Sequence, residues 1–349
     1  MTQSQVRPAE AERRIFGEAL VEAENLKVHF PITAGLFQRT VGAVRAVDDI
    51  SFEIRKGETL GLVGESGCGK TSVAATLLRL LPENAQVKGG KIFVNGTELL
   101  SLSEDEMRTI RWKRISMVFQ AAMNALNPVY KVGDQIIEAL ENHNMVSSNE
   151  EAYKRVEELF RLVDLDPKMM EQYPHEYSGG MRQRAVIAMA LACHPDLIIA
   201  DEPTTALDVI VQDNLLREMT ALQKKLGMSM IYISHDIAVI AEVSDRIGVM
   251  YAGRLVEYGS AKQIFKRPLH PYTYGLMSAF PSISGPKRKL KTMPGEPPDL
   301  INPPSGCRFH PRCPNAQEIC SQEVPEFRDL GDEHYVACYF PMEVTFNGG

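Results

Sequence analysis

Eight consecutive residues, at positions 64–71, have the composition and spacing of a phosphate-binding loop: Gly-Glu-Ser-Gly-Cys-Gly-Lys-Thr. Apolar runs precede and follow them, which predicts a strand, a glycine-rich loop and a helix. The glycines let backbone N–H groups turn towards a polyphosphate, and the N-terminal end of the helix attracts it further. A simple glycine turn before a helix is the alternative. We expect a nucleoside triphosphate to bind Gly64, Glu65, Ser66, Gly67, Cys68, Gly69, Lys70, Thr71 and Ser72.

A second group of polar residues stands at the ends of other predicted strands. Asp201 and Glu202, Gln120, and His235 each follow an apolar run typical of a buried strand. Parallel strands end at one edge of a sheet, so these side chains should meet beside the phosphate-binding loop. There Asp201 suits Mg²⁺ together with Thr71, and Glu202 can polarise an attacking water. Gln120 and His235 are then expected to sense the γ-phosphate, although each alone could be an ordinary surface residue, and Asp-Glu-Pro could simply end a strand.

A serine followed by two glycines, Ser178-Gly179-Gly180, begins a predicted helix about 20 residues before Asp201. Ser178 suits an N-cap, and the glycines allow backbone amides to approach a phosphate closely. Such a helix terminus can hold a second face of ATP. An ordinary capped helix start is the alternative interpretation.

The composition of the 349-residue chain is that of a globular protein, with 44 % hydrophobic and 24 % charged residues. No apolar run approaches the roughly 20 residues that span a bilayer, and the polar N-terminus is not a signal peptide, so we expect cytosolic residence. The net charge of -7 argues against a general nucleic-acid binder. Thirteen of the 21 prolines fall from Pro268 onward, which marks a change of organisation near residue 260.

Apolar runs alternating with helical patterns predict an α/β protein with a parallel sheet covered on both faces. Residues 1–20 are predicted to form a lead-in, and residues 31–46 a loop between two strands. A helical stretch at about 125–185 is predicted to interrupt the sheet. Residues 261–349 are expected to form a small cysteine-rich domain.

The order of these motifs resembles the nucleotide-binding subunit of an ABC transporter over residues from about 20 to 260. Positions 64–71 look like Walker A, Gln120 like the Q-loop, and 178–183 like the signature, with Tyr177 and Met181 departing from its commonest form. Asp201-Glu202 looks like Walker B and the catalytic glutamate, Ala206-Leu207-Asp208 like the D-loop, and His235 like the switch histidine. The resemblance implies a P-loop NTPase cassette with a RecA-like core.

The resemblance also implies roles for individual residues. Glu202, His235 and Gln120 would be catalytic, and Thr71, Gln120 and Asp201 would hold Mg²⁺. Ser178, Gly179, Gly180 and Asp208 would complete the ATP site. Phe30 would stack on adenine, or else be a core residue at the end of a strand.

Within that family the chain resembles the D-type ATPase of oligopeptide and dipeptide importers. The segments that carry this likeness are 64–69, 119–128, 175–184, 201–209, 250–253 and 270–273, together with the cysteine-rich tail. This branch implies ATP-driven peptide uptake, with oligosaccharides or nickel as alternative cargo. It implies a second, different ATPase as dimer partner, two permease subunits, an extracytoplasmic binding protein and a place at the cytoplasmic face of the membrane.

Three rival classes fit the sequence less well. A P-loop kinase would lack Ser178-Gly179-Gly180. A soluble ABC ATPase acting on DNA or ribosomes usually carries two cassettes or a long coiled coil, and the sequence shows neither a repeat nor heptads. A non-catalytic cassette would not need Glu202 and His235.

Four of the six cysteines, Cys307, Cys313, Cys320 and Cys338, fall near the C-terminus. Four thiolates suit either Zn²⁺ or a [4Fe–4S] cluster, although the gaps are longer than in typical zinc modules. The resemblance favours the [4Fe–4S] cluster; four reduced thiols are the remaining alternative. Cys68 and Cys193 are not expected to take part. Since nothing in the sequence places this cluster at the phosphate-binding edge, we expect a structural or regulatory role.

Overall fold

An eight-stranded sheet forms the centre of the computed structural model, which describes residues 19–35, 39–120, 125–204, 208–278 and 293–344. Its strand order is β11-β12-β10-β9-β3-β8-β7-β6, and the five strands from β9 to β6 are parallel. The strands are β3 (Thr59–Val63), β6 (Ile115–Val118), β7 (Leu197–Asp201), β8 (Ser229–Ile233), β9 (Arg246–Tyr251), β10 (Arg254–Ser260), β11 (Arg328–Asp329) and β12 (Tyr335–Val336). Every residue of β3, β7, β8 and β9 is buried, as expected for parallel strands covered on both faces.

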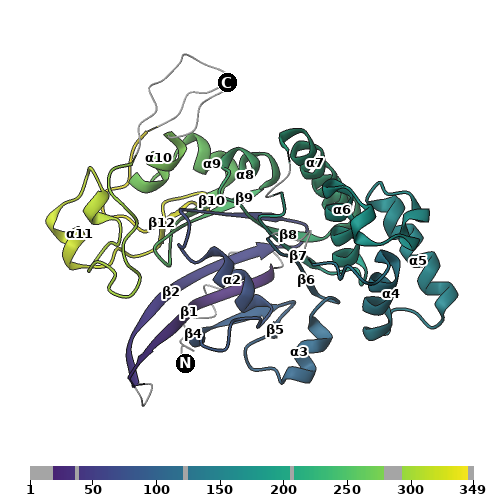
Figure 1. Cartoon of the computed structure of the whole chain (residues 1–349). Coiled ribbons are helices and arrows are strands. Elements are labelled where there is room, and N and C mark those ends of the chain that lie inside the picture. The colour runs from purple at the N-terminus through teal and green to yellow at the C-terminus, as the bar shows by residue number, and fades with distance from the viewer. Residues whose placement is uncertain (1–18, 36–38, 121–124, 205–207, 279–292, 345–349) are drawn as a thin grey trace, which may run out of the picture.

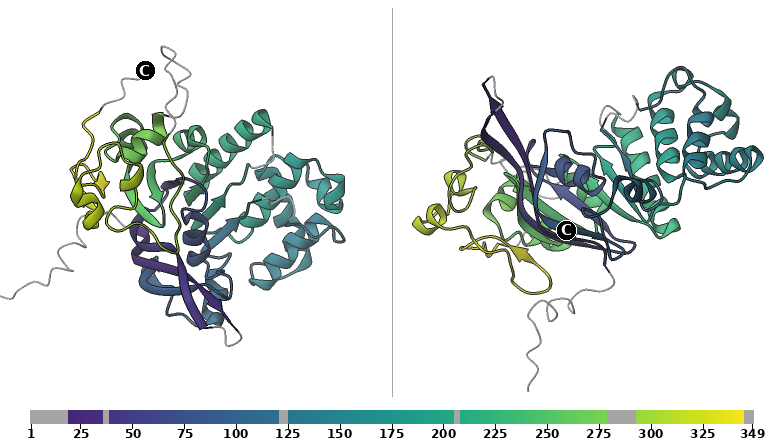
Figure 2. Two further views of the ribbon diagram at one scale, coloured as in Figure 1. Left: turned by 60° about the vertical axis from the view of Figure 1, so that its left-hand side comes forward. Right: turned by 90° about the horizontal axis from the view of Figure 1, so that it is seen from below.

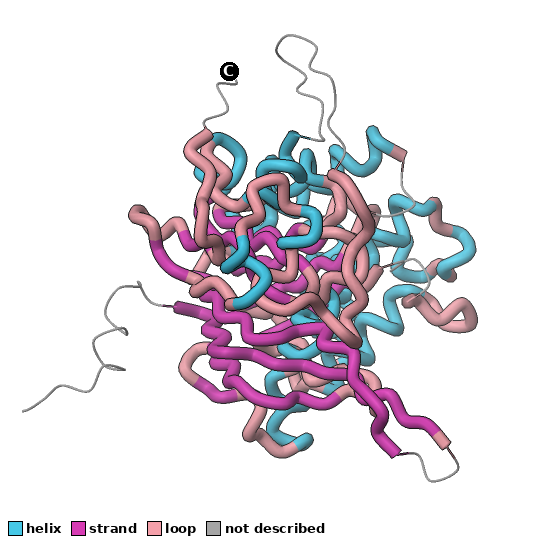
Figure 3. The backbone as a smooth tube through the Cα atoms, turned by 90° about the vertical axis from the view of Figure 1, so that its left-hand side faces the viewer, coloured by secondary structure: helices cyan, strands magenta, loops and turns pink. Residues whose placement is uncertain are grey.

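A second, antiparallel sheet of four strands packs beside the first, in the order β2-β1-β4-β5. It contains β1 (Ala19–Ala34), β2 (Arg39–Arg55), β4 (Gln86–Val94) and β5 (Thr97–Glu98). The long hairpin of β1 and β2 extends beyond the rest of the molecule (Figure 3). The predicted loop at 31–46 is therefore wrong for its described residues, because β1 and β2 pair as far as Ala34 and Arg39.

The helices cover both faces of the central sheet (Figure 1). They are α2 (Lys70–Leu77), α3 (Glu104–Ile110), α4 (Val132–Asn142), α5 (Asn149–Leu162), α6 (Gly179–Leu191), α7 (Val209–Leu226), α8 (Ile237–Val243), α9 (Ala261–Lys266), α10 (Pro271–Ser278) and α11 (Glu318–Gln322), with 3-10 turns η2 (Pro167–Glu171), η3 (Pro174–Glu176) and η4 (His310–Arg312). The predicted helical insertion comprises α4, α5, η2, η3 and α6. Helix α6 continues beyond residue 185, to Leu191. No helix of the described ranges is long and apolar enough to cross a membrane.

The C-terminal segment and the helical insertion lie on opposite sides of the central sheet (Figure 2). The segment is joined to the cassette by β12, which pairs with β10 through Glu257 and Tyr258. His334 contacts Glu257 at 2.8 Å, and both side chains are fully buried. Ile264, Tyr272 and Phe309, moreover, belong to the same apolar cluster as the core of the cassette. The described residues after 260 thus share that core instead of packing around one of their own.

Candidate active site

The phosphate-binding loop connects β3 to α2, in the predicted order, and two of its glycines have a steric requirement. Gly64 has φ 150° and Gly69, the N-cap residue of α2, has φ 108°. A Cβ at Gly64 would lie 2.1 Å from the carbonyl oxygen of Met250, and one at Gly69 would lie 2.0 Å from that of Ala46. Only glycine lets the loop pass this close to neighbouring backbone.

Lys70 is buried inside the curve of this loop. Its Nζ donates to the carbonyl oxygens of Gly64 at 2.8 Å and Glu65 at 3.2 Å. The ammonium group is thus held over the loop, with Thr71 exposed and Ser72 half-buried beside it. Cys68 is buried, which raises the pKa of its thiol, and its carbonyl accepts the N–H of Gly253. The neutral thiol packs inside the loop, where its Sγ accepts a weak hydrogen bond from Nζ of Lys70 at 3.6 Å.

Asp201 ends β7 next to the loop, and its side chain is only 3 % exposed. Burial raises the pKa of this carboxyl above its ordinary value, against the opposing effect of a hydrogen bond from Thr71. A buried carboxylate beside a hydroxyl is a donor pair of the kind that Mg²⁺ binds, and a bound cation would favour the ionised form. The residues present therefore fit the predicted Mg²⁺ site.

Glu202 brings the other predicted catalytic residues together. Its Oε2 accepts a hydrogen bond from Gln120 Nε2 at 2.8 Å, and its Oε1 lies 3.0 Å from Nδ1 of His235. The residue has φ 48°, a conformation that costs energy in a non-glycine residue, and its N–H donates to the carbonyl of Ile233. The carboxylate is thus held by partners from the ends of two other strands, at the shared sheet edge where the sequence places all three residues.

Ser178 caps α6, where its Oγ accepts the N–H of Met181 at 3.3 Å. Its side chain is exposed, and Gly180 packs against Val211 at the start of α7. Asp208 caps α7 by accepting the N–H groups of Ile210 and Val211. A nucleotide contact of Asp208 stays a prediction, and Ala206 and Leu207 lie outside the described residues.

Phe30 lies within β1 and pairs with Val44, so it is not at the end of a strand. It is half-buried and packs against the apolar cluster that contains β3 residues and Cys68. A core contact is therefore present, and stacking on adenine stays a prediction.

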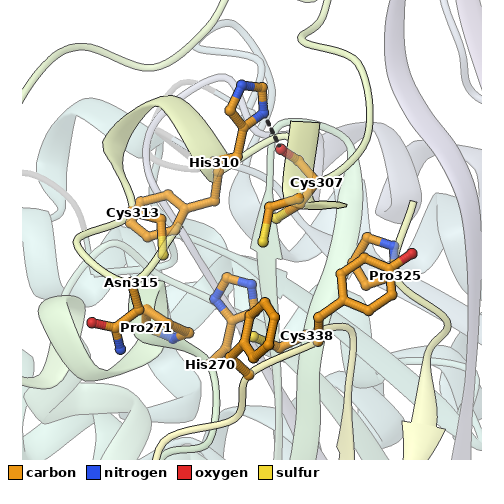
Figure 4. Close-up of a pocket in the computed structure, with 12 residues that line it drawn as sticks. His270, Pro271, Cys307, His310, Cys313, Asn315, Pro325 and Cys338 are labelled. Carbon is orange, nitrogen blue, oxygen red and sulfur yellow. Dashed lines mark hydrogen bonds between the residues drawn. The ribbon is translucent and has the colours of Figure 1, made fainter. Parts of the chain in front are cut away.

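The four C-terminal cysteines line one cavity (Figure 4). The volume of this cavity is only about 10 Å³. Burial raises the pKa of Cys307, Cys313 and Cys338, the last to about 12, so these thiols are neutral here. Within the part of the chain that the structure describes, no three His, Cys, Asp or Glu side chains are arranged as a metal site. The cysteines thus converge without already having the geometry of a ligand set.

His270 also lines this cavity, and its tautomer follows from its contacts. Nδ1 accepts the N–H of Tyr272 at 3.0 Å, and burial lowers the pKa of the ring to about 3, so the single proton is on Nε2. Nε2 is buried without a hydrogen-bond partner among the described residues. This buried N–H next to the four cysteines is therefore left without an acceptor, which a thiolate could supply.

Two residues of the C-terminal segment contact the phosphate-binding loop, which sequence reasoning missed. Arg312 binds the carboxylate of Glu65, and the hydroxyl of Tyr272 accepts the N–H of Glu65 at 2.9 Å. Both residues stand in motifs noted in the sequence, but no local pattern reveals contacts across more than 200 positions.

Two family models match the chain. The ABC transporter model matches residues 47–205, and the model of the oligopeptide/dipeptide transporter C-terminal region matches residues 256–320. The oligopeptide transport ATP-binding protein AppF of Bacillus subtilis (strain 168) is 44 % identical over 92 % of this chain and 97 % of its own length. The chain belongs to the family of ATP-binding proteins of oligopeptide and dipeptide ABC transporters.

Other members of this family show the same degree of similarity. The oligopeptide transport ATP-binding protein OppD of Escherichia coli (strain K12) is 44 % identical, and 93 % of this chain and 94 % of that protein are covered. The dipeptide transport ATP-binding protein DppD of Bacillus subtilis (strain 168) is 46 % identical, with 92 % and 95 % covered. As a member of this family, the chain is an ABC-type ATPase.

Solved structures support the same fold. A dimeric post-hydrolysis state of the ATP-binding cassette MJ0796, bound to ADP and Pi, superposes with a TM-score of 0.60 at 25 % identity. The match covers 69 % of this chain and 98 % of that one. The ABC cassette fold expected from the motifs is confirmed, and the remaining part of this chain has no counterpart in that cassette.

Proposed function

We propose that the chain is the ATP-binding subunit of an importer of dipeptides or oligopeptides, and that it hydrolyses ATP to drive their uptake. The convergence of Gln120 and His235 on Glu202, beside the Asp201–Thr71 pair, carries this proposal at the level of the site. The peptide transporters among the relatives favour peptides over oligosaccharides or nickel. Soluble non-transport ABC ATPases are not among these relatives.

The residues of this chain have separate tasks in hydrolysis. Backbone N–H groups of 64–72 bind the phosphates, and Lys70 exchanges the carbonyls of Gly64 and Glu65 for phosphate oxygens. Thr71, Asp201 and Gln120 would hold Mg²⁺, which neutralises charge on the transferred phosphoryl group. Glu202, oriented by Gln120 and His235, polarises the attacking water.

Ser178, Gly179 and Gly180 act on the nucleotide of another ATPase subunit; the exposed Ser178 and the partly exposed glycines are accessible to it. The working unit is then a dimer, and the partner is a second, homologous ATPase. Asp208 would lie at this interface. Two permease subunits would dock on the cytoplasmic side, on either side of residues 121–128, where the apolar side chains of Phe119, Val129 and Tyr130 are 48 %, 70 % and 57 % exposed. An extracytoplasmic binding protein would supply the peptide.

The division of the chain follows the same logic. Residues 21–260 form the ATPase domain with its helical part at about 125–185, after a lead-in at 1–20. Residues 261–349 form a C-terminal cysteine-rich domain whose described residues share the core of the cassette, and in it Cys307, Cys313, Cys320 and Cys338 hold a [4Fe–4S] cluster. Zn²⁺ is the alternative and needs less space than the cluster.

The metal proposal is tested by anaerobic purification of the full chain. About four irons per chain with broad visible absorbance support the cluster, and about one zinc per chain supports zinc. Cys313→Ser should lower the metal content, whereas Cys193→Ser should not. Four freely titrating C-terminal thiols in folded, metal-free protein would reject both centres.

The transport proposal is tested by reconstituting the chain with its permeases and partner ATPase in vesicles. Uptake of a labelled dipeptide or oligopeptide should require ATP and the binding protein, and should be lost in Lys70→Ala. ATP-dependent uptake of nickel or an oligosaccharide, with no uptake of peptides, would contradict the substrate class.

A further inference from the structure

The contacts between the cysteine-bearing segment 307–313 and the phosphate-binding loop have no part in the mechanism above. We propose that Arg312 is a positioning residue that holds this loop through Glu65, so that segment 307–313 sets the affinity for ATP. The inference rests on the proposed nucleotide site at 64–72. It concerns a contact between the C-terminal region and the ATP site within one chain.

Arg312 and Glu65 form a bidentate ion pair. Arg312 Nη1 lies 2.8 Å from Oε2 of Glu65, and Nη2 lies 2.9 Å from Oε1. The Arg312 side chain is 7 % exposed and that of Glu65 is 23 % exposed, so solvent screens the pair only in part. The hydrogen bonds to Glu65 raise the pKa of Arg312 above its ordinary value. Bidentate arginine–carboxylate pairs fix geometry as well as contributing energy.

Arg312 is itself held in place, which a positioning residue requires. Its Nε donates to the carbonyl of Pro294 at 2.8 Å, and Nη1 lies 3.2 Å from the hydroxyl of Tyr251. The guanidinium also lies over the rings of Tyr251 and Phe309, at 5.8 and 6.0 Å from their centres. The position of the Arg312 guanidinium is therefore fixed by these contacts before any nucleotide binds.

Glu65 is held at its backbone as well as at its carboxylate. Its N–H donates to Tyr272, from α10, and its carbonyl oxygen accepts from Nζ of Lys70. Residues of the C-terminal region thus fix both the backbone and the side chain of the loop residue that helps to hold Lys70. Loss of the Arg312 contact should leave this part of the loop free to take other conformations.

The other end of segment 307–313 is connected to the same loop through residues 252 and 253. Arg308 donates to Asp48 and to the carbonyl of Ala252. The next residue, Gly253, donates its N–H to the carbonyl of Cys68 at 2.9 Å and accepts from the N–H of Asp48. The two arginines adjacent to Cys307 and Cys313 therefore connect the wall of the cysteine cavity to the phosphate-binding loop at two points.

The experiment measures the Kd of a fluorescent ATP analogue for the full chain, together with amide hydrogen exchange of residues 64–69 without nucleotide. Arg312→Gln should raise the Kd about tenfold and speed exchange in the loop, because charge-assisted pairs contribute on this scale. The Kd of Arg312→Lys should lie between those of the wild type and Arg312→Gln, since lysine keeps the charge but cannot form the bidentate contact. Arg328→Gln, at an exposed position on β11 outside segment 307–313, is the matched control and should match the wild type.

The double variant Arg312→Gln/Glu65→Gln separates positioning from charge. If Arg312 only neutralises Glu65 near the phosphates, removing both charges should restore the wild-type Kd, and that result would overturn the proposal. If Arg312 positions the loop, the Kd stays raised. Should Arg312→Gln fail to fold, Glu65→Gln alone must still speed exchange in the loop and raise the Kd; unchanged exchange and Kd would reject the proposal. Loss of the proposed nucleotide site is distinguished because the wild type would then bind no ATP analogue and Lys70→Ala would change nothing.

Discussion

The two surfaces that we propose for contact with ATP differ in how complete they are. On the Walker side, Lys70 and Asp201 are 7 % and 3 % exposed, and both have hydrogen-bond partners within the chain. On the signature side, Ser178 is exposed, and its hydroxyl accepts from its own helix. Burial holds the first set of groups in place before ATP binds. In the proposed dimer, the second set acquires a target only when another subunit brings its nucleotide.

Because of this difference, we expect one surface to determine ATP binding and the other to determine ATP hydrolysis. The chain should bind ATP alone through residues fixed by its own packing. Hydrolysis should depend on groups presented across an interface. Variants can test each surface separately, beginning with the largest expected effect.

The largest effect is expected on the Walker side, where Glu202→Gln should lower ATP hydrolysis in the assembled complex by about 10²-fold or more. The amide keeps the shape of the side chain but cannot polarise water in the same way. ATP affinity of the isolated chain should be nearly unchanged, because Glu202 does not hold the phosphates. Glu242→Gln, at an exposed position on α8, is the control. Wild-type turnover by the Glu202→Gln complex would refute the assignment.

A smaller effect is expected from Gly69→Ala, which tests the steric requirement of the loop. The new Cβ would meet the carbonyl of Ala46 at 2.0 Å, so the loop must shift, and ATP affinity should fall about tenfold or more. Gly227→Ala is the matched control, because Gly227 has φ 65° but open space around its Cβ. It should cost about 1 kcal/mol of stability and leave ATP affinity unchanged. Equal ATP affinities for both variants would show that the close approach is unimportant.

Most of the Walker side could be predicted from the sequence because its signals are local. The phosphate-binding loop lies between two apolar runs, and Asp201 and Glu202 directly follow another. Parallel strands then bring their C-terminal ends to one edge, so Gln120 and His235 could be placed there. The hydrogen bonds of these two residues to Glu202 could not be predicted, since they depend on how the three side chains are oriented in the folded chain.

The failures have physical causes as well. Pro31 and the glycines near it predicted a loop, yet beyond His29 strand β1 pairs only with β2, and one-sided pairing tolerates proline. Strands β11 and β12 have two residues each, too few to show a periodic pattern. The contact of Arg312 with Glu65 joins positions 247 residues apart, and only the folded chain reveals it.

The central claim is that this chain binds ATP on one surface and completes the site of another subunit with the other surface. The Ser178→Arg variant tests this most directly. Two quantities are measured: the ATP affinity of the isolated chain and the rate of ATP hydrolysis by the assembled complex. We predict unchanged affinity, because Ser178 lies outside the chain's own phosphate-binding loop, and loss of hydrolysis at the shared interface. Unchanged hydrolysis and unchanged ATP-driven association with the partner ATPase would contradict the account.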